Sequence, residues 1–401
     1  MSPEHTGLQS RAGQLGGTRI LAGRKNYWFL GPGGIARLGA GQVSPEGTLR
    51  PAADRQLRER GLFTAPTDHL YSLTVLTSTD CNLGCGYCFQ NVGQDLSGGN
   101  RPPRITHSRL TSERITSILE FSRRQMDASG LDRLSILLFG GEPLLNPSGC
   151  VELLTRAADY GLASAWMISN ATLLTPKLAK DLWDARLRFI QVTFDGDQPD
   201  HDRIRIRRSS GGTFDAIVHN VARASEATPI AWALRVNVSH RNYRGIDSLL
   251  ARLAAALDTS RCTISFDQIR DMGVGYGNDL EYTRNLSAWF SRWQRQALEL
   301  GFKVPRPRAL APCRTCGYGD GRYGAVVNAD GTLSSCWETA GKPGWQVGST
   351  TDGFLPTEQT RERWISCGDM YDPSPDDADV AAFRDAVDAA LLDYLAETGR
   401  L

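Results

Sequence analysis

Short apolar runs alternate with amphipathic segments between residues 70 and 300 of this 401-residue chain. The runs are rich in Leu, Ile, Val and aromatic residues, as buried strands are, and the segments between them repeat apolar residues at helical spacing. The predicted strands are Leu70–Thr77, Leu134–Phe139, Ser164–Ser169, Phe189–Phe194, Ala231–Val238 and Thr263–Ile269. The predicted helices lie near 108–126, 149–160, 176–185, 213–226, 243–257 and 281–300.

This alternation predicts an α/β fold with a parallel sheet and crossover helices. Six strand–helix units are fewer than the eight of a closed barrel, so we expect a partial (β/α)6, TIM-like barrel over residues 69–303. Functional residues of such sheets lie at the carboxyl ends of the strands.

Three further segments flank this core. Residues 1–68 are rich in Gly and Pro and form an N-terminal extension, in which Tyr27-Trp28-Phe29-Leu30 is a possible peptide-recognition surface. Residues 304–370 begin with a Pro-rich linker and contain a hairpin signal over 324–336, so they predict a small C-terminal domain. Residues 371–401 contain an expected helix over 376–397.

Charge and apolar content exclude two classes of partner. The chain has 45 basic and 44 acidic residues, which leaves no overall field for nucleic acid. We find no apolar run long enough to span a membrane and no secretory signal, which predicts a cytoplasmic protein. Nine cysteines in a reducing compartment are more often metal ligands or reactive groups than disulfides.

Three of these cysteines, Cys81, Cys85 and Cys88, follow the first predicted strand with CxxxCxxC spacing. Three thiolates on one loop can each hold one iron of a cubane and leave the fourth iron open to another ligand. A zinc loop with a fourth ligand elsewhere, or three thiols that are buried by coincidence, would give the same spacing.

Loop and context resemble the radical S-adenosylmethionine (SAM) superfamily, and Phe139-Gly140-Gly141-Glu142-Pro143 resembles its GGEP motif. The resemblance implies a 4Fe-4S cluster whose open iron is chelated by SAM, and reductive cleavage of SAM to a 5′-deoxyadenosyl radical. It also implies SAM contacts from Gly140, Gly141 and Glu142, and an adenine contact from Phe89. Ser169 and Asn170, after the third strand, would meet SAM, although capping of the next helix is the alternative.

The stretch from Thr193-Phe194-Asp195-Gly196 to Gly212-Thr213-Phe214-Asp215 is similar to the SPASM/twitch branch of that superfamily. The similarity implies SAM contacts from Thr193 and Arg205, and Asn237 at the end of the fifth strand is a further candidate. His201 and Asp202 are interpreted as structural, although an acid–base role stays open.

A second group of cysteines lies in the C-terminal part. Cys313, Cys316 and Cys336 resemble the opening of a SPASM domain, but only Cys367 follows, so the resemblance implies the shorter twitch type with one auxiliary 4Fe-4S cluster. A zinc ion on four thiolates, or a cluster with one open iron, is the alternative. Trp337 stands where sulfatase maturases have an aspartate base, which leaves the catalytic residue unknown and Glu338 a weak candidate.

The resemblance thus implies a radical SAM oxidoreductase that takes electrons from an external one-electron reductant. Its expected substrate is a ribosomally made peptide (a RiPP precursor), entering as an extended strand beside residues 311–340. The alternatives are a dehydrogenase or decarboxylase of small molecules in antibiotic biosynthesis and, from another class, a non-catalytic zinc-binding module.

Overall fold

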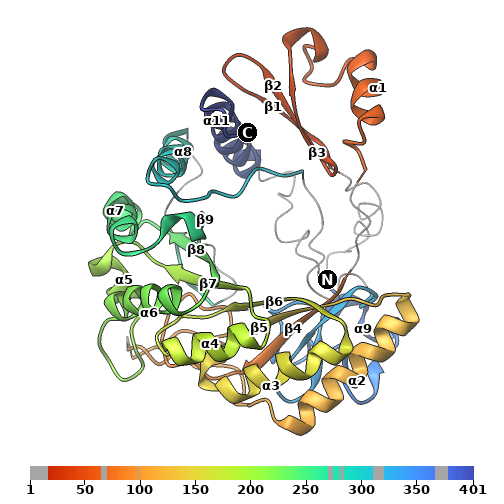
Figure 1. Ribbon diagram of the computed structural model, residues 1–401, viewed down its shortest axis with the longest axis vertical. Coiled ribbons are helices and arrows are strands. Elements are labelled where there is room, and N and C mark those ends of the chain that lie inside the picture. The colour runs from red at the N-terminus through yellow and green to blue at the C-terminus, as the bar shows by residue number, and fades with distance from the viewer. Residues whose placement is uncertain are drawn as a thin grey trace, which may run out of the picture.

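A parallel sheet forms the centre of the molecule (Figure 1). The computed structural model describes residues 17–64, 70–97, 99–269, 274–278, 280, 284–309, 320–365 and 378–401. Six neighbouring strands run parallel in chain order: β4 (Tyr71–Ser78), β5 (Leu134–Gly140), β6 (Leu162–Ile168), β7 (Phe189–Phe194), β8 (Ala231–Val238) and β9 (Cys262–Gln268). Each lies within two residues of a predicted strand, which confirms the partial-barrel fold.

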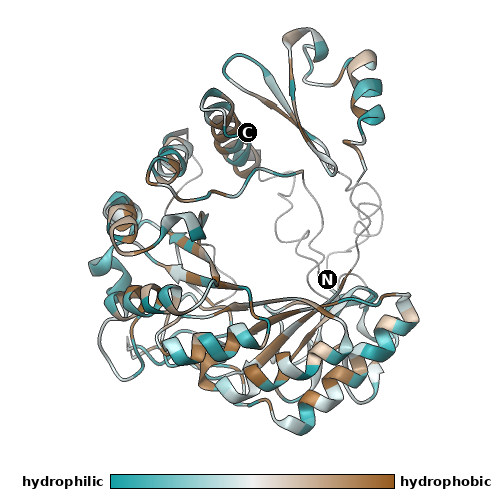
Figure 2. Cartoon of the chain, in the orientation of Figure 1, coloured by the Kyte–Doolittle hydropathy of each residue, from teal (hydrophilic) through white to brown (hydrophobic). Residues whose placement is uncertain are grey.

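Crossover helices cover the outer face of this sheet (Figure 1). They are α2 (Ser112–Ser129), α3 (Pro147–Ala157), α4 (Pro176–Asp184), α6 (Phe214–Ala227), α7 (Ile246–Ala256) and α8 (Arg284–Glu299), with the short α5 (Gln198–Ile204) before α6. Their apolar faces pack against alternate strand residues such as Leu138, Met167 and Val192 in one continuous core. Figure 2 shows the apolar character of the central strands. The two-residue period of a strand sends the intervening side chains to the inner face.

The hairpin predicted over 324–336 forms as β10 (Gly324–Val327) and β11 (Thr332–Ser334), followed by β12 (Gly348–Ser349), β13 (Gly353–Phe354) and the one-turn helix α9 (Thr357–Thr360). It joins the central sheet, because β10 pairs parallel with β4 and Val326 lies opposite Thr74. The order is therefore β13-β12-β11-β10-β4-β5-β6-β7-β8-β9. The boundaries of the proposed domain 304–370 stay a prediction, since residues 310–319 and 366–377 lie outside the described residues.

This pairing affects the expectation that a substrate peptide binds as an extra strand beside residues 311–340. Both long edges of β10 and β11 are already occupied, β10 by β4 and β11, and β11 by β10 and β12. A strand entering beside these two elements would have no free backbone groups to bond. The expectation that a peptide adds as a strand along this hairpin is therefore wrong for residues 324–334.

The N-terminal extension folds into a three-stranded antiparallel sheet and a helix. Its elements are β1 (Arg19–Ala22), β2 (Tyr27–Gly31), β3 (Gly34–Leu38) and α1 (Pro51–Glu59). It packs against the C-terminal helix α11 (Ala378–Glu397), which also lies along α8 (Figure 1). Trp28, Phe29 and Leu30 are fully buried in this unit. They are core residues, so the expected peptide-recognition surface at Tyr27–Leu30 is not available there.

Two polar contacts fix this packing. The Trp28 indole N–H donates to Asp393 Oδ1 at 2.8 Å in a buried position. Arg19 bridges Asp385 and Asp388 on the same helix at 2.5 and 2.7 Å. Among the described helices, none combines the length and the apolar content needed to cross a bilayer.

Trp28→Phe tests the contact between the two chain ends. The ring is kept, but a buried carboxylate oxygen loses its donor, so we expect the free energy of unfolding to fall by about 1–3 kcal/mol. Urea unfolding followed by circular dichroism measures it. Trp183→Phe is the matched control, since that half-buried indole stacks on Arg188 at 3.8 Å and phenylalanine preserves the stacking. An equal loss in both variants would contradict the role of the indole N–H.

Candidate active site

The cysteine loop, residues 79–91, follows β4 at the carboxyl edge of the sheet. Local bonds fix the shape of this loop: Leu83 N–H points to Cys81 Sγ at 3.4 Å, and Asn91 Nδ2 donates to the Cys85 carbonyl at 3.0 Å. Cys88 N–H donates to the Cys85 carbonyl at 3.2 Å. The loop therefore presents Cys81, Cys85 and Cys88 from one turn, as the spacing predicts.

Three cysteines on one loop are a donor set suited to the irons of a cluster. In the described part of the chain, no three His, Cys, Asp or Glu side chains converge as the ligands of one metal ion do. A cubane places its thiolates on separate irons, so its ligands need not converge on one point. Burial raises the pKa of Cys81 to about 11 and that of Cys85 to about 12, so both thiols are neutral until a metal displaces their protons.

Gly140 and Gly141, at the end of β5, lie against the backbone of Ser78 and Asp80, where β4 leads into the cysteine loop. Gly140 has φ +137°, and a Cβ there would lie 2.2 Å from the Ser78 carbonyl oxygen. A Cβ on Gly141 would lie 2.2 Å from the Asp80 carbonyl oxygen. The backbone bonds Gly141 N–H to Ser78 O and Glu142 N–H to Asp80 O close this approach. Both glycines are thus required by the contact between the ends of β4 and β5.

The Glu142 carboxylate is fully buried and accepts three hydrogen bonds. The donors are Ser169 Oγ at 2.7 Å, Asn170 N–H at 2.7 Å and Leu144 N–H at 2.9 Å. Burial raises its pKa, and these donors oppose the rise. The structure therefore gives this side chain a positioning role, in which it joins the end of β5 to the end of β6. Its contact with the SAM amino group stays a prediction.

Asn170 continues the connection toward the cysteines. Its Nδ2 donates to Asn82 Oδ1 at 2.9 Å and lies 3.8 Å from Cys81 Sγ. Its Oδ1 accepts from Thr172 N–H at 3.0 Å and Thr172 Oγ1 at 2.7 Å. The next helix, α4, is capped by Thr175, whose side chain accepts from Leu178 N–H, so the alternative that Ser169 or Asn170 caps this helix is wrong. The amide group of Asn170 faces the cysteine loop instead.

On the other side of the loop, Arg205 lies within a buried polar network. Its Nη1 donates to the Tyr87 hydroxyl at 2.7 Å and lies 3.4 Å from Asp195 Oδ2. Tyr87 donates to Asp195 Oδ2 at 2.8 Å and accepts from Asn237 Nδ2 at 3.0 Å. The structure therefore brings the predicted residues Arg205 and Asn237 together through Tyr87 and Asp195, which the sequence analysis did not select.

Among the described residues, two buried atoms of this network have no hydrogen-bond partner. They are Arg205 Nε, a donor, and Asp195 Oδ1, an acceptor. Buried polar atoms of native proteins are nearly always satisfied, so this donor and acceptor are suited to a polar ligand. The amino and carboxylate groups of SAM supply the complementary chemistry.

His201 connects Asp195 to Arg205. Asp195 N–H donates to His201 Nδ1 at 3.3 Å, so the ring proton is on Nε2, which lies 3.1 Å from Thr213 Oγ1. The Thr213 hydroxyl donates to the Arg205 carbonyl at 2.9 Å. Asp202 Oδ1 accepts from the backbone N–H groups of Thr213 and Phe214 at 2.7 and 2.9 Å. The described bonds of His201 and Asp202 thus support their structural interpretation.

The inner face of the sheet is divided by polarity. Toward the carboxyl ends of the strands, the half over β10, β4, β5 and β6 is apolar and aromatic: Phe89 stacks on Phe139 with ring centroids 6.1 Å apart, and Phe139 stacks on Trp337 at 5.5 Å. The half over β7, β8 and β9 is polar. Its inward residues include Gln191, Thr193, Arg235, Asn237, Ser265 and Asp267. Thr193 lies opposite Arg235 in this polar half.

Of the second cysteine group, Cys336 lies within the described residues, and it is buried after β11. Cys313, Cys316 and Cys367 lie outside them. Ser335 holds the chain that leads toward Cys367, since its Oγ donates to the Arg363 carbonyl at 2.7 Å and accepts from Ile365 N–H at 3.1 Å. The expected four-cysteine site therefore stays a prediction.

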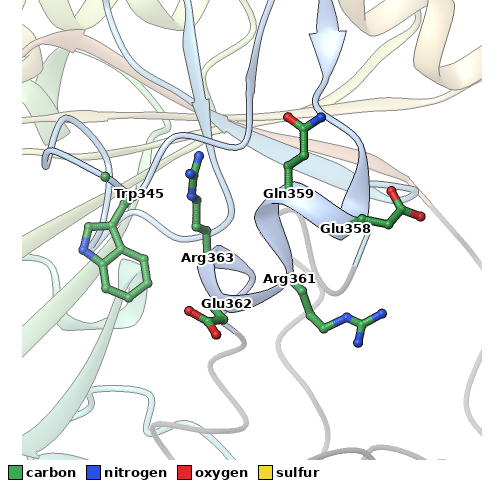
Figure 3. A pocket seen from close by; sticks show the side chains of 7 residues that line it. Trp345, Glu358, Gln359, Arg361, Glu362 and Arg363 are labelled. Atoms are coloured by element: carbon green, nitrogen blue, oxygen red, sulfur yellow. The ribbon is translucent and has the colours of Figure 1, made fainter.

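A hollow of about 690 Å³ lies beside this segment (Figure 3). Its lining residues are Gly344, Trp345, Glu358, Gln359, Arg361, Glu362 and Arg363. The acidic and basic side chains there carry both signs of charge, and none of them belongs to the cysteine loop or the Arg205 network. We therefore assign the chemistry to the inner edge of the sheet and not to this hollow.

His201→Gln tests the connecting role of the imidazole. Burial holds the pKa of His201 well below its usual value, so the neutral ring stabilises the fold above about pH 6.5. As the pH falls below that value the unfolded chain takes up the proton first, and this stability is lost at up to about 1.4 kcal/mol per pH unit. Urea unfolding between pH 7.5 and 5.5 should show a smaller pH slope in the variant.

The exposed His219, on α6, provides the control for this experiment. His219→Asn should retain the wild-type slope between pH 7.5 and 5.5. A slope that is the same in the His201 variant and the wild type would contradict the assignment of a buried, neutral His201.

Comparison with known proteins agrees with this geometry. Residues 75–253 match the family model of the radical SAM superfamily. Fe-coproporphyrin III synthase of Methanosarcina barkeri is 25% identical over 216 residues, 54% of this chain and 49% of that protein. PqqA peptide cyclase of Bradyrhizobium diazoefficiens is 31% identical over 116 residues, 29% of this chain and 26% of that protein. The matched stretches thus span less than half of either relative.

A solved structure gives the same fold. Native anSMEcpe with bound AdoMet and Cp18Cys peptide aligns with a TM-score of 0.59 at 16% identity, over 82% of this chain and 99% of that one. The match of the family model lies over β4 to α7, where the cysteine loop, Glu142 and Arg205 are found. Residues 75–253 therefore form a radical SAM domain, whose cofactors are a 4Fe-4S cluster and SAM.

Proposed function

We propose that this chain is a radical SAM oxidoreductase that modifies a ribosomally made peptide. One observation carries the proposal: three separate motifs meet at one carboxyl edge of the sheet. They are the cysteine loop, the Glu142 carboxylate with its bonds to residues 169 and 170, and the Arg205–Tyr87–Asn237 network. This edge is where α/β sheets place their ligands.

In this proposal Cys81, Cys85 and Cys88 hold the cluster, and SAM lies between the cysteine loop and the Arg205 network. When bound, the cluster and SAM supply a radical able to abstract hydrogen from an unactivated C–H bond. Arg205 and Asp195 offer their unpaired Nε and Oδ1 to the polar end of SAM. Phe89, stacked on Phe139, offers an aromatic face to the adenine.

The remaining inner face positions the substrate and excludes water. Phe139, Trp166 and Trp337 form an apolar wall, and Arg235 and Asp267 lie across from it with their charged groups 3.7 Å apart. Glu338 is half-buried beside Trp337. Burial raises its pKa, opposed by Trp337, Lys342 and Arg235. A carboxylate with a raised pKa close to the wall is suited to accept a substrate proton, which makes Glu338 a stronger candidate base than its position in the sequence suggested.

We also propose that Cys313, Cys316, Cys336 and Cys367 hold one auxiliary 4Fe-4S cluster. Cys336 follows a strand of the same sheet as the cysteine loop, and Trp337 contacts the Phe139–Phe89 stack. A cluster at Cys336 would accept the electron left on the substrate or bind the substrate directly. An external one-electron reductant would be required, because reductive cleavage of SAM consumes one electron.

The peptide substrate is supported by two of the similar proteins. PqqA peptide cyclase acts on a peptide by its name, and anSMEcpe has been solved with a bound peptide. The match to Fe-coproporphyrin III synthase favours the alternative, a small-molecule substrate, over a longer stretch of this chain. The two hypotheses differ in which added substrate the enzyme consumes, a peptide or a small molecule, so a direct assay can distinguish them.

Two cysteine variants separate the roles of the two sites. Anaerobically reconstituted wild-type protein should hold about eight irons, from two cubanes. Cys81→Ala, Cys85→Ala and Cys88→Ala together should leave about four and abolish formation of 5′-deoxyadenosine. Cys336→Ala should retain substrate-free cleavage of SAM but stop product formation. Normal product from the Cys336 variant, or zinc in place of iron at that site, would contradict the auxiliary cluster.

The substrate class is tested by mass spectrometry. A precursor peptide encoded beside this gene, incubated with reduced enzyme and SAM, should lose hydrogen or gain a crosslink in step with 5′-deoxyadenosine formation. Heat-denatured enzyme and the triple cysteine variant are the controls. An unchanged peptide, together with oxidation of a small molecule such as a sugar, would replace the peptide assignment by the alternative.

A further inference from the structure

The feature that the proposed mechanism leaves unexplained is a second arginine beside the cysteine loop, half-buried and with its Nε buried. Arg104 lies on the segment that leads into α2, and its guanidinium reaches across the loop. Nη1 donates to Asn91 Oδ1 at 3.4 Å and lies 3.6 Å from Cys88 Sγ. Nη2 donates to Gln90 Oε1 at 2.8 Å and to the Thr79 carbonyl at 3.3 Å.

The backbone fixes the position of this side chain. Arg104 and Asn91 form an antiparallel bridge, flanked by the bonds Val92 N–H to Pro103 O and Ile105 N–H to Gln90 O. The guanidinium therefore spans both ends of the cysteine loop, from Thr79, directly after β4, to Gln90 and Asn91, which follow Cys88. This arrangement leaves the head group little freedom to move away from the sulfurs.

The charge of Arg104 has no acidic partner. Its hydrogen-bond acceptors in the described chain are neutral oxygens and the Cys88 sulfur, and its buried Nε has no partner. Arg205, the cation on the other side, lies against the Asp195 carboxylate. All three cysteine sulfurs are close enough for their charged forms to interact with Arg104. A guanidinium that is partly removed from water and has no acidic partner is unfavourable, so an anion at this place would stabilise it.

We propose that Arg104 compensates the negative charge of the cysteine-bound cluster and thereby raises the reduction potential of that cluster. This inference rests on the proposed function, since it requires a cluster on Cys81, Cys85 and Cys88. Reduction adds one negative charge to the cluster, which a nearby cation stabilises, and an N–H group directed at a ligand sulfur acts in the same direction. Arg104 would thus act on the reduction potential of the cluster through its charge, without contacting the substrate.

The test is a redox titration of full-length, anaerobically reconstituted protein, followed by the electron paramagnetic resonance signal that changes when SAM is added. At one fixed ambient potential, Arg104→Gln should lower the ratio of reduced to oxidised cluster at least tenfold, about 59 mV for a one-electron couple. Arg104→Lys, which keeps the charge, should stay close to the wild type. Arg101→Gln is the matched control, because Arg101 is an exposed arginine on the same segment.

The outcomes separate this inference from the proposed function. If the wild type forms no SAM-responsive cluster that the triple cysteine variant loses, the proposed function fails and the inference fails with it. If that cluster forms but titrates at the same potential in Arg104→Gln and wild type, only the inference is overturned. Loss of the cluster in both Arg104→Gln and Arg104→Lys would also overturn it, since the hydrogen bonds across the loop, and not the charge, would then be the contribution of Arg104.

Discussion

The site depends on a carboxylate that is kept out of water. Glu142 is fully buried, and removing a carboxylate from solvent is unfavourable unless hydrogen bonds replace the lost water. Ser169 Oγ and the N–H groups of Asn170 and Leu144 provide this replacement. Because these donors lie on the segments that follow β5 and β6, satisfying one charge fixes the spacing of two strand ends. Asn170 also donates a hydrogen bond to Asn82, which connects the end of β6 to the cysteine loop.

The local pattern of the sequence was sufficient for the strands and crossover helices, since each of those elements buries one face and repeats its apolar residues accordingly. It was also sufficient for the cysteine loop, whose ligands lie within eight residues of the chain. It could not predict that β10 pairs with β4, because those strands are far apart in the chain and their pairing leaves no local signal. For the same reason Tyr87, Asp195 and Arg104 were missed, although each is close to a residue that the motifs identified. Their roles come from contacts with distant segments and not from their own neighbours.

The division of the inner face has a consequence for the chemistry. In the proposed function, the apolar wall beside Phe139 and Trp337 would keep water from a reactive carbon, and the charged pair Arg235 and Asp267 on the other half would hold a polar group of the substrate. A substrate with one apolar and one polar end would therefore bind in a single orientation. Glu338 is half-buried next to Trp337, and Arg235 of the polar half acts on its carboxylate.

The N-terminal sheet and the C-terminal helix α11 pack on each other, so a deletion of either one changes the stability of the other. The segment after α8 pairs with the outer edge of β9, through Ile264 N–H to Lys303 O and Lys303 N–H to Cys262 O, and covers backbone groups that would otherwise be exposed. Further along the chain, α11 packs on α8 and supports the N-terminal sheet through Asp393 and Trp28. Deleting residues 1–60 would remove the donor from Asp393 and expose Leu392, so a loss of turnover would report damaged packing as readily as lost recognition. Single substitutions at exposed positions of α1, such as Arg55, leave that packing intact and are the changes that can reveal a peptide-binding surface on this extension.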